Sequence, residues 1–268
     1  MPKLNATHDP ARRSWIESAN RADGDFPIQN LPWGVFACGG EQSRGGIAIG
    51  DQIVDLKAAC EAGMFSGAAA EIAQAASAPA LNDAMALGPR SAAALREQLS
   101  DLLRADGPAR ARLEPRADKF LVPMRDARLH LPAAIGAYSD FLSSIFHTMR
   151  MGRNNVPPSY KYQPIAYNSR ASSVRIGGET IVRPKGEFRT EAGEVQYGPE
   201  PSLDFELEMA AFIGPGNAVG APIPIAEAAD HIFGYCLLND WSARGIQRWE
   251  SQPLGPFSGK SFSTSISP

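Results

Sequence analysis

Short apolar runs broken by glycine and proline set the strongest constraint on the fold of this 268-residue chain. From Asp25 on, three such runs occupy residues 31–38, 46–49 and 52–56, separated by Gly39-Gly40 and Gly50-Asp51. Runs of this length with tight-turn residues between them are typical of short antiparallel strands. The pattern therefore predicts a small antiparallel barrel near the N-terminus.

The next stretch, residues 57–105, is rich in alanine and leucine. Apolar side chains recur there near i, i+3 and i+4 spacing, at Ala92, Leu95, Leu99, Leu102 and Leu103, which indicates packed helices. Residues 106–119 combine proline, glycine and charges without an apolar period, and the first twenty residues are polar and aperiodic. We therefore expect a flexible extension over 1–20, an N-terminal domain over 21–118 and a second domain over 119–268.

The net charge of −3 argues against the classes of protein that rely on concentrated positive charge. Nucleic acids and anionic membranes are polyanions, so neither is an expected partner, and a small-molecule substrate fits better. Cys38, Cys60 and Cys236 form no CxxC pair, which indicates reduced thiols in a cytoplasmic protein. No apolar stretch reaches the ~18 residues of a membrane span, and the start lacks the apolar core of a signal peptide.

The segment Leu203–Met209 alternates strictly between apolar and acidic residues. A strand there places Leu203, Phe205, Leu207 and Met209 on one face and Asp204, Glu206 and Glu208 on the other. Like charges side by side on a sheet are costly unless water or a cation compensates them. Two interpretations of Glu206 and Glu208 follow: a solvated outer face, or a cation site.

Two further carboxylates favour the cation site. Asp240 stands where an apolar run ends, and Asp140 follows the run at 129–138. Four hard oxygen donors without a cluster of cysteine or histidine suit Mg²⁺ or Ca²⁺ rather than zinc. Ser242 is a candidate N-cap for the helix that follows.

From about residue 25 to residue 268, the chain closely resembles the fumarylacetoacetase family. The matching motifs keep the order of the family: Asp25–Pro32, Ser139–Ser144 with His147, Arg170–Ser173, Leu203–Met209, Gly214–Asn217, Asn239–Arg244 and Pro253–Phe262. The resemblance implies a mixed α+β fold, mainly β. A small SH3-like N-terminal barrel with helices would precede an incomplete β-roll catalytic domain of the fumarylacetoacetase type.

The resemblance also implies a set of site residues. In the family, the residues that match Asp140, Glu206, Glu208 and Asp240 bind one divalent cation, Mg²⁺ or Ca²⁺, and those that match Lys260 and Thr264 lie beside it. If Lys260 and Arg244 both face the site, their charges and that of the cation balance four carboxylates, which makes burial acceptable.

His147 matches the general base of the family, a role that suits imidazole because it titrates near neutral pH. Arg244, Gln247 and Lys260 are implied to hold the enolate that forms when a carbon–carbon bond breaks. Tyr167 is implied to bind the substrate together with Arg244 and Gln247, whose i, i+3 spacing makes them neighbours on one helix.

Several positions depart from the family. Leu142 stands where the family has a substrate-contacting tyrosine, and Asn168 lies in an altered loop beside Tyr167. The stretch from His147 to residue 160 is short and lacks the usual arginine for the substrate carboxylate, for which Arg153 is the candidate replacement. The catalytic domain of the family continues past the position of Pro268 with more strands and a carboxylate that orients the histidine. We therefore expect the chain as written to be inactive and poorly soluble.

The activity implied by the resemblance is hydrolysis of 4-fumarylacetoacetate to fumarate and acetoacetate, the last step of tyrosine and phenylalanine catabolism, in a homodimer. Two alternatives stay open. The substrate can be another β-keto acid, as in acylpyruvate hydrolases or oxaloacetate decarboxylases, although these relatives commonly lack the N-terminal domain. The chain can also be a binding protein that keeps the metal without turnover, an alternative motivated by Leu142 and Asn168.

Overall fold

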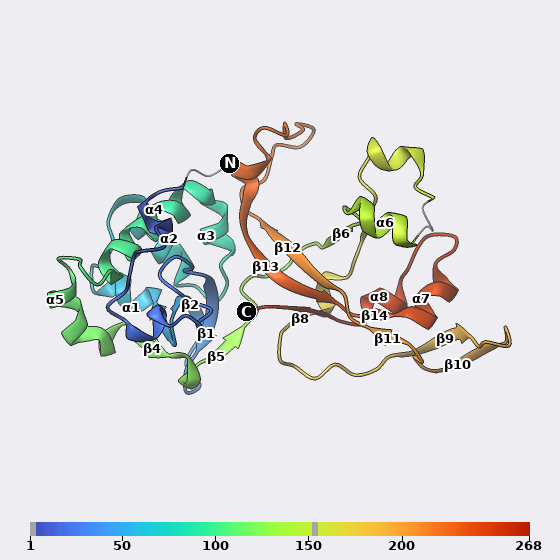
Figure 1. The fold of residues 1–268 in the computed structure, drawn as a ribbon, viewed down its shortest axis with the longest axis horizontal. Coiled ribbons are helices and arrows are strands. Elements are labelled where there is room, and N and C mark those ends of the chain that lie inside the picture. Colours follow the sequence, from blue (N-terminus) through green and yellow to red (C-terminus); the bar gives the residue numbers. More distant parts are fainter. Residues whose placement is uncertain (1–3, 152–154) are drawn as a thin grey trace. The chain divides into compact units, whose positions relative to one another are not determined.

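The computed structural model describes residues 4–151 and 155–268, which form a mixed fold of helices and strands (Figure 1). It divides into two compact units. The first unit holds the chain up to Ala134 together with Ala210–Cys236 and Pro268, and the second holds Ile135–Met209 with Leu237–Ser267. None of the helices in the described part of the chain has the length and apolar character of a membrane-spanning segment.

The first unit is built on a five-stranded sheet in the order β4-β3-β2-β1-β5, with antiparallel neighbours. Its strands are β1 (Trp33–Ala37), β2 (Arg44–Ile49), β3 (Gln52–Asp55), β4 (Leu121–Pro123) and β5 (Arg128–His130). The three strands predicted from the short apolar runs are confirmed as β1 to β3. The sheet also takes in β4 and β5, which lie beyond residue 118; the division at 118 and the SH3-like closure stay predictions.

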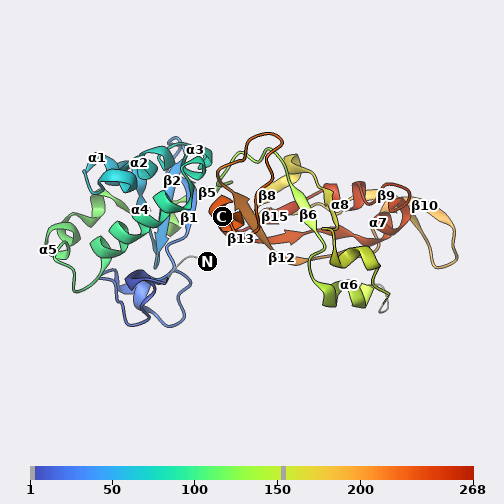
Figure 2. The same cartoon turned by 90° about the horizontal axis from the view of Figure 1, so that it is seen from above.

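Helices supply the rest of the first unit, as the apolar spacing over 57–105 predicts. They are α1 (Leu56–Glu61), α2 (Gly67–Ala76), α3 (Asn82–Ala86), α4 (Gly88–Leu103) and α5 (Arg110–Leu113), with 3-10 turns at Ala6–His8, Glu17–Asn20, Glu114–Lys119, Met124–Asp126 and Ala228–His231. In α4 the i, i+4 row of Leu95, Leu99 and Leu103 is fully buried in the core. The helices α1 to α4 can be followed in Figure 2.

The N-terminal segment packs into this core, so the prediction of a flexible extension is wrong for the residues around Trp15. Trp15, Ile16 and Ala19 are at most 7% exposed, and the Trp15 indole N–H donates to the carbonyl oxygen of Leu102 at 3.0 Å. Gly50 permits the close approach, because a Cβ there would lie 2.3 Å from Ser18 Oγ. The apolar residues of this segment are few and find their partners about 90 residues away, which no local period reveals.

The second unit consists of short strand pairs and part of a larger sheet. Its strands are β6 (Ser139–Phe141), β7 (Ala166–Asn168), β8 (Val174–Ile176), β9 (Lys185–Arg189), β10 (Val195–Pro199), β11 (Leu203–Asp204), β14 (Ser242–Ala243) and β15 (Thr264–Ile266), while β12 (Leu207–Ile213) and β13 (Ile232–Asp240) each have residues in both units. Strands pair as β6-β7, β9-β10, β11-β14 and β12-β13-β15-β8. The helices are α6 (Ile145–Met151), α7 (Arg244–Glu250) and α8 (Ser258–Ser261), with 3-10 turns at Pro158–Lys161 and Ala171–Ser173.

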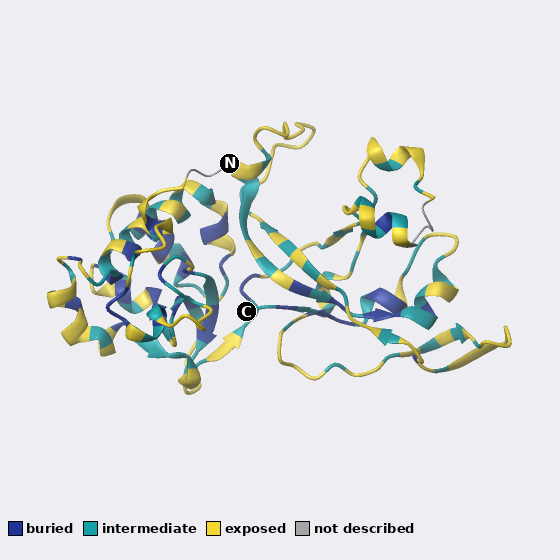
Figure 3. Ribbon diagram, in the orientation of Figure 1, coloured by how far each residue is buried: buried dark blue, intermediate teal, exposed yellow. Residues whose placement is uncertain are grey.

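The single strand predicted for Leu203–Met209 is interrupted, because residues 205–206 lie outside β11 and β12, and Asp204 at its start is 51% exposed. From Phe205 to Met209 the predicted alternation is present, with Glu206 and Glu208 on the more buried side. The side chain of Glu206 is 20% exposed, whereas Phe205, Leu207 and Met209 are 60%, 70% and 71% exposed. Figure 3 shows the resulting alternation of exposed and intermediate residues along β12. The interpretation of Glu206 and Glu208 as a solvated outer face is therefore wrong.

Replacing Trp15 by alanine should destabilise the protein by about 3 kcal/mol or more, because a buried indole and its hydrogen bond are lost together. Urea unfolding followed by circular dichroism measures the change. Leu4→Ala is the control, since Leu4 is 83% exposed in the same segment. Equal unfolding midpoints for Trp15→Ala and the parent would show that the segment is not part of the folded core.

Candidate metal centre

Three carboxylates converge in the second unit. Asp140 on β6, Glu208 on β12 and Asp240 at the end of β13 each offer one oxygen, and these oxygens all lie within 4.8 Å of one another. The sheet register sets the place of each: Asp140 stands opposite Tyr167 in the β6-β7 pair, and Asp240 stands opposite Thr264 in the β13-β15 pair. Residues 100 positions apart in the chain thus share one acidic cluster.

Glu206, the fourth carboxylate of the predicted metal site, forms ion pairs with two cationic side chains. Its two oxygens accept from different side chains: Oε1 from the Arg244 guanidinium at 2.6 Å, and Oε2 from the Lys260 ammonium. Although burial raises the pKa of Glu206, Lys260 and Arg244 more than compensate and hold it below its usual value. The structure brings Glu206 next to the acidic cluster through Lys260, which also binds Asp240 Oδ2.

Lys260 is held by three acceptors at once. Its buried ammonium, 4% exposed, binds Glu206 and Asp240 and donates to Ser242 Oγ at 2.8 Å. The short helix α8 that carries Lys260 is fixed at its start by Glu250, whose carboxylate accepts from the backbone N–H groups of residues 257–259 at 2.7 to 2.9 Å. Lys260 is therefore a fixed positive charge at the edge of the acidic cluster, not a solvated loop lysine.

Arg244 and Gln247 meet on α7, as their spacing predicts. Arg244 Nη1 donates to Gln247 Oε1 at 3.1 Å, and the guanidinium also donates to Asp204 Oδ2 from Nε and Nη2 at 3.0 and 2.8 Å. The pKa of Arg244 is raised because, against the effect of burial, Glu206 and Asp204 both favour its charged form. Asp204, on β11, is a partner that the sequence analysis does not assign.

Two tyrosines lie against the acidic cluster. Tyr167, predicted to bind substrate, donates its hydroxyl to Asp240 Oδ2 at 3.3 Å. Burial and then the negative charge of Asp240 raise the pKa of both Tyr167 and Tyr138 far above the ordinary value. Both hydroxyls therefore stay protonated and can serve as hydrogen-bond donors at the site. Tyr138 carries no distinguishing sequence signal beyond its place two residues before Asp140.

Burial and the crowding of negative charge in the cluster raise the pKa of two of its carboxyl groups. Burial, followed by repulsion from Asp140, Asp240 and Glu206, raises the pKa of Glu208 to about 7. Burial raises the pKa of Asp240 to about 6 although the Lys260 ammonium opposes the shift. Clustered carboxyl groups that hold protons when no cation is present are a common arrangement at cation-binding sites.

The unpaired atoms of the cluster fit a cation that prefers oxygen ligands. Asp240 Oδ1 and Thr264 Oγ1 are both buried, and neither finds a hydrogen-bond partner among the residues that the structure describes. Buried oxygens without a partner are costly, so each calls for a water molecule or an ion. The donor set consists of carboxylate and hydroxyl oxygens, which suits Mg²⁺ or Ca²⁺.

The remaining predicted residues are less constrained by the structure. His147 lies half-buried on α6, and its imidazole makes no side-chain hydrogen bond to another residue within the described ranges. Leu142 directly follows β6, and Asn168 is exposed at the end of β7. Arg153 lies outside the described residues. The structure thus gathers the carboxylates, Lys260, Arg244 and Gln247, and leaves the role of His147 a prediction.

Ser242 is not the helix cap that the sequence suggests. It lies on β14, where its hydroxyl donates to the carbonyl oxygen of Asp240 at 2.9 Å and accepts from Lys260. The residue before α7 is Ala243, which has no capping side chain. A serine just before a helix fits the N-cap pattern whether it caps the helix or lies on a strand, so only the strand pairing distinguishes the two roles.

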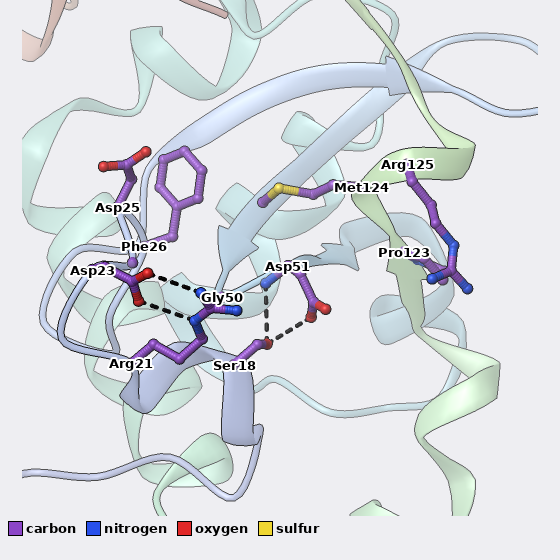
Figure 4. A pocket seen from close by; sticks show the side chains of 11 residues that line it. Ser18, Arg21, Asp23, Asp25, Phe26, Gly50, Asp51, Pro123, Met124 and Arg125 are labelled. Carbon is purple, nitrogen blue, oxygen red and sulfur yellow. Dashed lines mark hydrogen bonds and ion pairs between the residues drawn. The ribbon is translucent and has the colours of Figure 1, made fainter.

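A pocket in the first unit does not carry comparable chemistry (Figure 4). Its lining pairs most of its own polar groups: Arg21 binds Asp23 at 2.9 Å, and the Ser18 hydroxyl donates to Asp51 at 2.6 Å. The Arg21 and Asp23 side chains are 67% and 72% exposed. Charges that are paired and open to solvent require no ligand, so the acidic cluster is the stronger candidate.

Replacing Glu208 by glutamine should weaken binding of Mg²⁺ or Ca²⁺ at least about tenfold, since one charged ligand is lost from a cluster of three. Calorimetric titration of the chelator-treated protein measures the affinity. Glu194→Gln, an exposed carboxylate in the β9-β10 turn, is the charge-matched control. Unchanged affinity in Glu208→Gln would place the cation elsewhere.

The affinity for the cation should rise with pH. Because the pKa values of Glu208 and Asp240 are raised to about 7 and about 6, the cation-free cluster binds protons that the cation must displace. We expect binding to strengthen at least about tenfold from pH about 5 to about 8, most steeply below pH about 6, where both carboxyl groups bind protons, and to level off above pH about 7. Titrations in buffers of equal ionic strength test this, and a flat profile would mean that the ion displaces no protons from these two carboxyl groups.

Comparison with known proteins agrees with these motifs. A family model described as "Fumarylacetoacetase N-terminal" matches residues 29–132, and one described as "Fumarylacetoacetate (FAA) hydrolase C-terminal" matches residues 137–268. A solved fumarylacetoacetate hydrolase from Exiguobacterium antarcticum is 18% identical, with a TM-score of 0.48 over 87% of this chain and 62% of that one. At that TM-score the likeness carries no argument about the chain.

The curated relatives are more similar. A fumarylacetoacetase of Oryza sativa subsp. japonica is 43% identical over 96% of this chain and 62% of its own length, and one of Mus musculus is 46% identical over 92% and 60%. The chain thus spans about three fifths of the length of these relatives. Together, the two family models and these identities show that the chain belongs to the fumarylacetoacetate hydrolase family.

Proposed function

We propose that the chain carries the metal-dependent site that hydrolyses the carbon–carbon bond of 4-fumarylacetoacetate to fumarate and acetoacetate. The observation that supports this most is the arrangement of Asp140, Glu208 and Asp240 as a three-carboxylate cluster with the fixed cations Lys260 and Arg244 beside it. The names of the curated relatives point to the same substrate.

Asp140, Glu208 and Asp240 would hold one Mg²⁺ or Ca²⁺, with Glu206, Lys260 and Thr264 around it. When bound, that ion supplies positive charge to the oxo groups of a β-diketo acid. Tyr167 and Tyr138 keep hydroxyl donors at the edge of the cluster. The protein thereby presents fixed donors where negative charge develops during the reaction.

In the proposed reaction, His147 takes a proton from water as the water oxygen adds to the ketone carbonyl of the fumaryl group, which is conjugated with the carbon–carbon double bond. The tetrahedral intermediate breaks the bond between this carbon and the acetoacetyl carbon, which gives the new carboxyl group of fumarate and the enolate of acetoacetate. Arg244, Gln247 and Lys260 stabilise that enolate until its carbon takes the proton back from His147. The new carboxyl group gives its proton to solvent, and water is the only co-substrate.

Two alternatives use the same cluster. Leu142 and Asn168, where the family carries other side chains, would suit a different β-keto acid and so a hydrolase or decarboxylase of another substrate. A chain that binds the metal without turnover is the second alternative. Comparing turnover of 4-fumarylacetoacetate, acylpyruvate and oxaloacetate with metal affinity separates the three, because only the last alternative retains binding while all turnover is absent.

We further propose that the chain acts in the cytoplasm, in tyrosine and phenylalanine catabolism, and that it assembles as a homodimer. The exposed apolar row of Phe205, Leu207, Met209 and Leu237, 60% to 71% exposed, supports an additional covering layer in the assembled protein. The five-stranded sheet of the first unit would correspond to the SH3-like barrel.

Replacing His147 by alanine should lower kcat by roughly 10²-fold while leaving metal affinity unchanged, the usual scale for losing a general base. The loss of the diketone absorbance of 4-fumarylacetoacetate, with and without a chelator, measures turnover. Because the chain spans only part of its relatives' length, the assay is run on this chain and on a version extended to the full length of these relatives.

His8→Ala, which replaces an exposed histidine of the first unit, is the control. An unaltered kcat in His147→Ala would remove His147 from the mechanism. Absence of metal-dependent hydrolysis from both parent proteins, when both are folded and bind the cation, would overturn the proposed function itself.

A further inference from the structure

Glu200 is a buried carboxylate that the proposed reaction does not use. It is 1% exposed, and within the described ranges no lysine or arginine forms an ion pair with its carboxylate. An ionised carboxylate in such a place is costly unless hydrogen bonds compensate it. Its partners therefore indicate what its position serves.

The partners are backbone N–H groups, two of them at the start of α7. Glu200 Oε1 accepts from the N–H of Ser202 at 2.7 Å and of Gly245 at 2.9 Å, and Oε2 accepts from the N–H of Ile246 at 2.9 Å. The first N–H groups of a helix have no partner within the helix. A charged acceptor there makes hydrogen bonds about twice as strong as neutral ones. Glu200 thus takes the place of the N-cap that Ala243 cannot provide.

The helix held in this way carries two residues of the proposed site. Arg244 immediately precedes the two bound N–H groups, and Gln247 immediately follows them. The helix α7 also packs on β9, where Ile246, 3% exposed, lies over Gly186. The Glu200 carboxylate and this apolar contact together fix the rotation and the position of the first turn of α7.

The last residue of α7 extends the effect to Lys260. Glu250 closes α7 and binds the N–H groups at the start of α8, which carries Lys260. A shift of α7 therefore moves both cations that bind Glu206. The carboxylates Asp140, Glu208 and Asp240 stand on β6, β12 and β13, none of which supplies a partner to the Glu200 side chain.

We propose that Glu200 is a positioning residue that acts through α7, placing Arg244 and Gln247, and through Glu250 also Lys260, to hold the substrate-derived enolate. The assignment rests on the proposed function for the identity of the ligand, but the positioning itself does not. The contacts of Glu200 are to the element that carries the cationic half of the site, and none of them is to Asp140, Glu208 or Asp240.

Gly245 offers a second, independent way to disturb the contact between Glu200 and α7. A Cβ at residue 245 would lie 2.8 Å from Glu200 Oε1 and 3.2 Å from Oε2. A carboxylate cannot stay in place against a methyl group at that distance. Gly245→Ala should therefore displace the Glu200 carboxylate without altering any charge. Its effect should be smaller once Glu200 is already alanine, because only the contact of the new Cβ with Phe188 Cβ, at 3.2 Å, then remains.

The test compares Glu200→Gln and Glu200→Ala with the parent, with Glu187→Gln as the control for an exposed carboxylate on β9. Glutamine keeps the size of glutamate, but its amide group turns a donor towards N–H groups. We expect hydrogen exchange at the Gly245 and Ile246 amides to accelerate at least about tenfold, and the Arg244 Nε–H resonance to move towards that of a free arginine. Mg²⁺ affinity should fall by less than the affinity for the organic ligand, because Glu200 contacts none of the three clustered carboxylates.

Ligand binding is tested with acetoacetate in saturating Mg²⁺, where we expect about tenfold weaker binding in Glu200→Gln. Gly245→Ala should change the Arg244 resonance and acetoacetate binding less in Glu200→Ala than in the parent. A lower melting temperature with an unchanged Arg244 resonance would show a purely structural role and overturn the proposal, as would additive effects in the double variant. A parent protein that binds Mg²⁺ but not acetoacetate would count against the proposed function, while amide exchange and the Arg244 resonance would still decide the role of Glu200.

Discussion

The buried ammonium of Lys260, shared between Glu206 and Asp240, is the interaction on which the rest of the site depends. Without it, Asp240 would be a fully buried carboxylate facing Asp140 and Glu208 with no positive charge in contact. One lysine cannot neutralise the whole group, and Arg244 divides its charge between Glu206 and the half-exposed Asp204. The remaining negative charge is what a divalent cation would balance.

Strands and helices position different parts of the site. Strand register places the carboxylates, because β6, β12 and β13 each bring a side chain to one point through backbone pairing. Short helices place the cations, and each of these helices is too short to be stable by itself. Backbone N–H groups bound by Glu200 and Glu250 supply the stability that helix length does not.

The sequence predicts the local features of this fold well. The strands around residues 33–55, the helices with the Leu95, Leu99 and Leu103 row, and the alternation from Phe205 to Met209 all follow from spacing within a few residues. It fails where the partner is distant. The docking of Trp15 against Leu102, and the binding of α7 by Glu200 instead of Ser242, depend on contacts across 87 and about 45 residues. The direction of the acidic face is equally hidden, since alternation marks two faces without saying which one the rest of the chain covers.

The close approach of Gly245 to the Glu200 carboxylate couples the residue types that the two positions can hold. In a related sequence, a side chain at 245 would occupy the space that the carboxylate of a glutamate at 200 takes here. Substitutions at the two positions should therefore occur together. Aligned sequences can test this coupling, because a glutamate at 200 in this place is expected only beside glycine at 245.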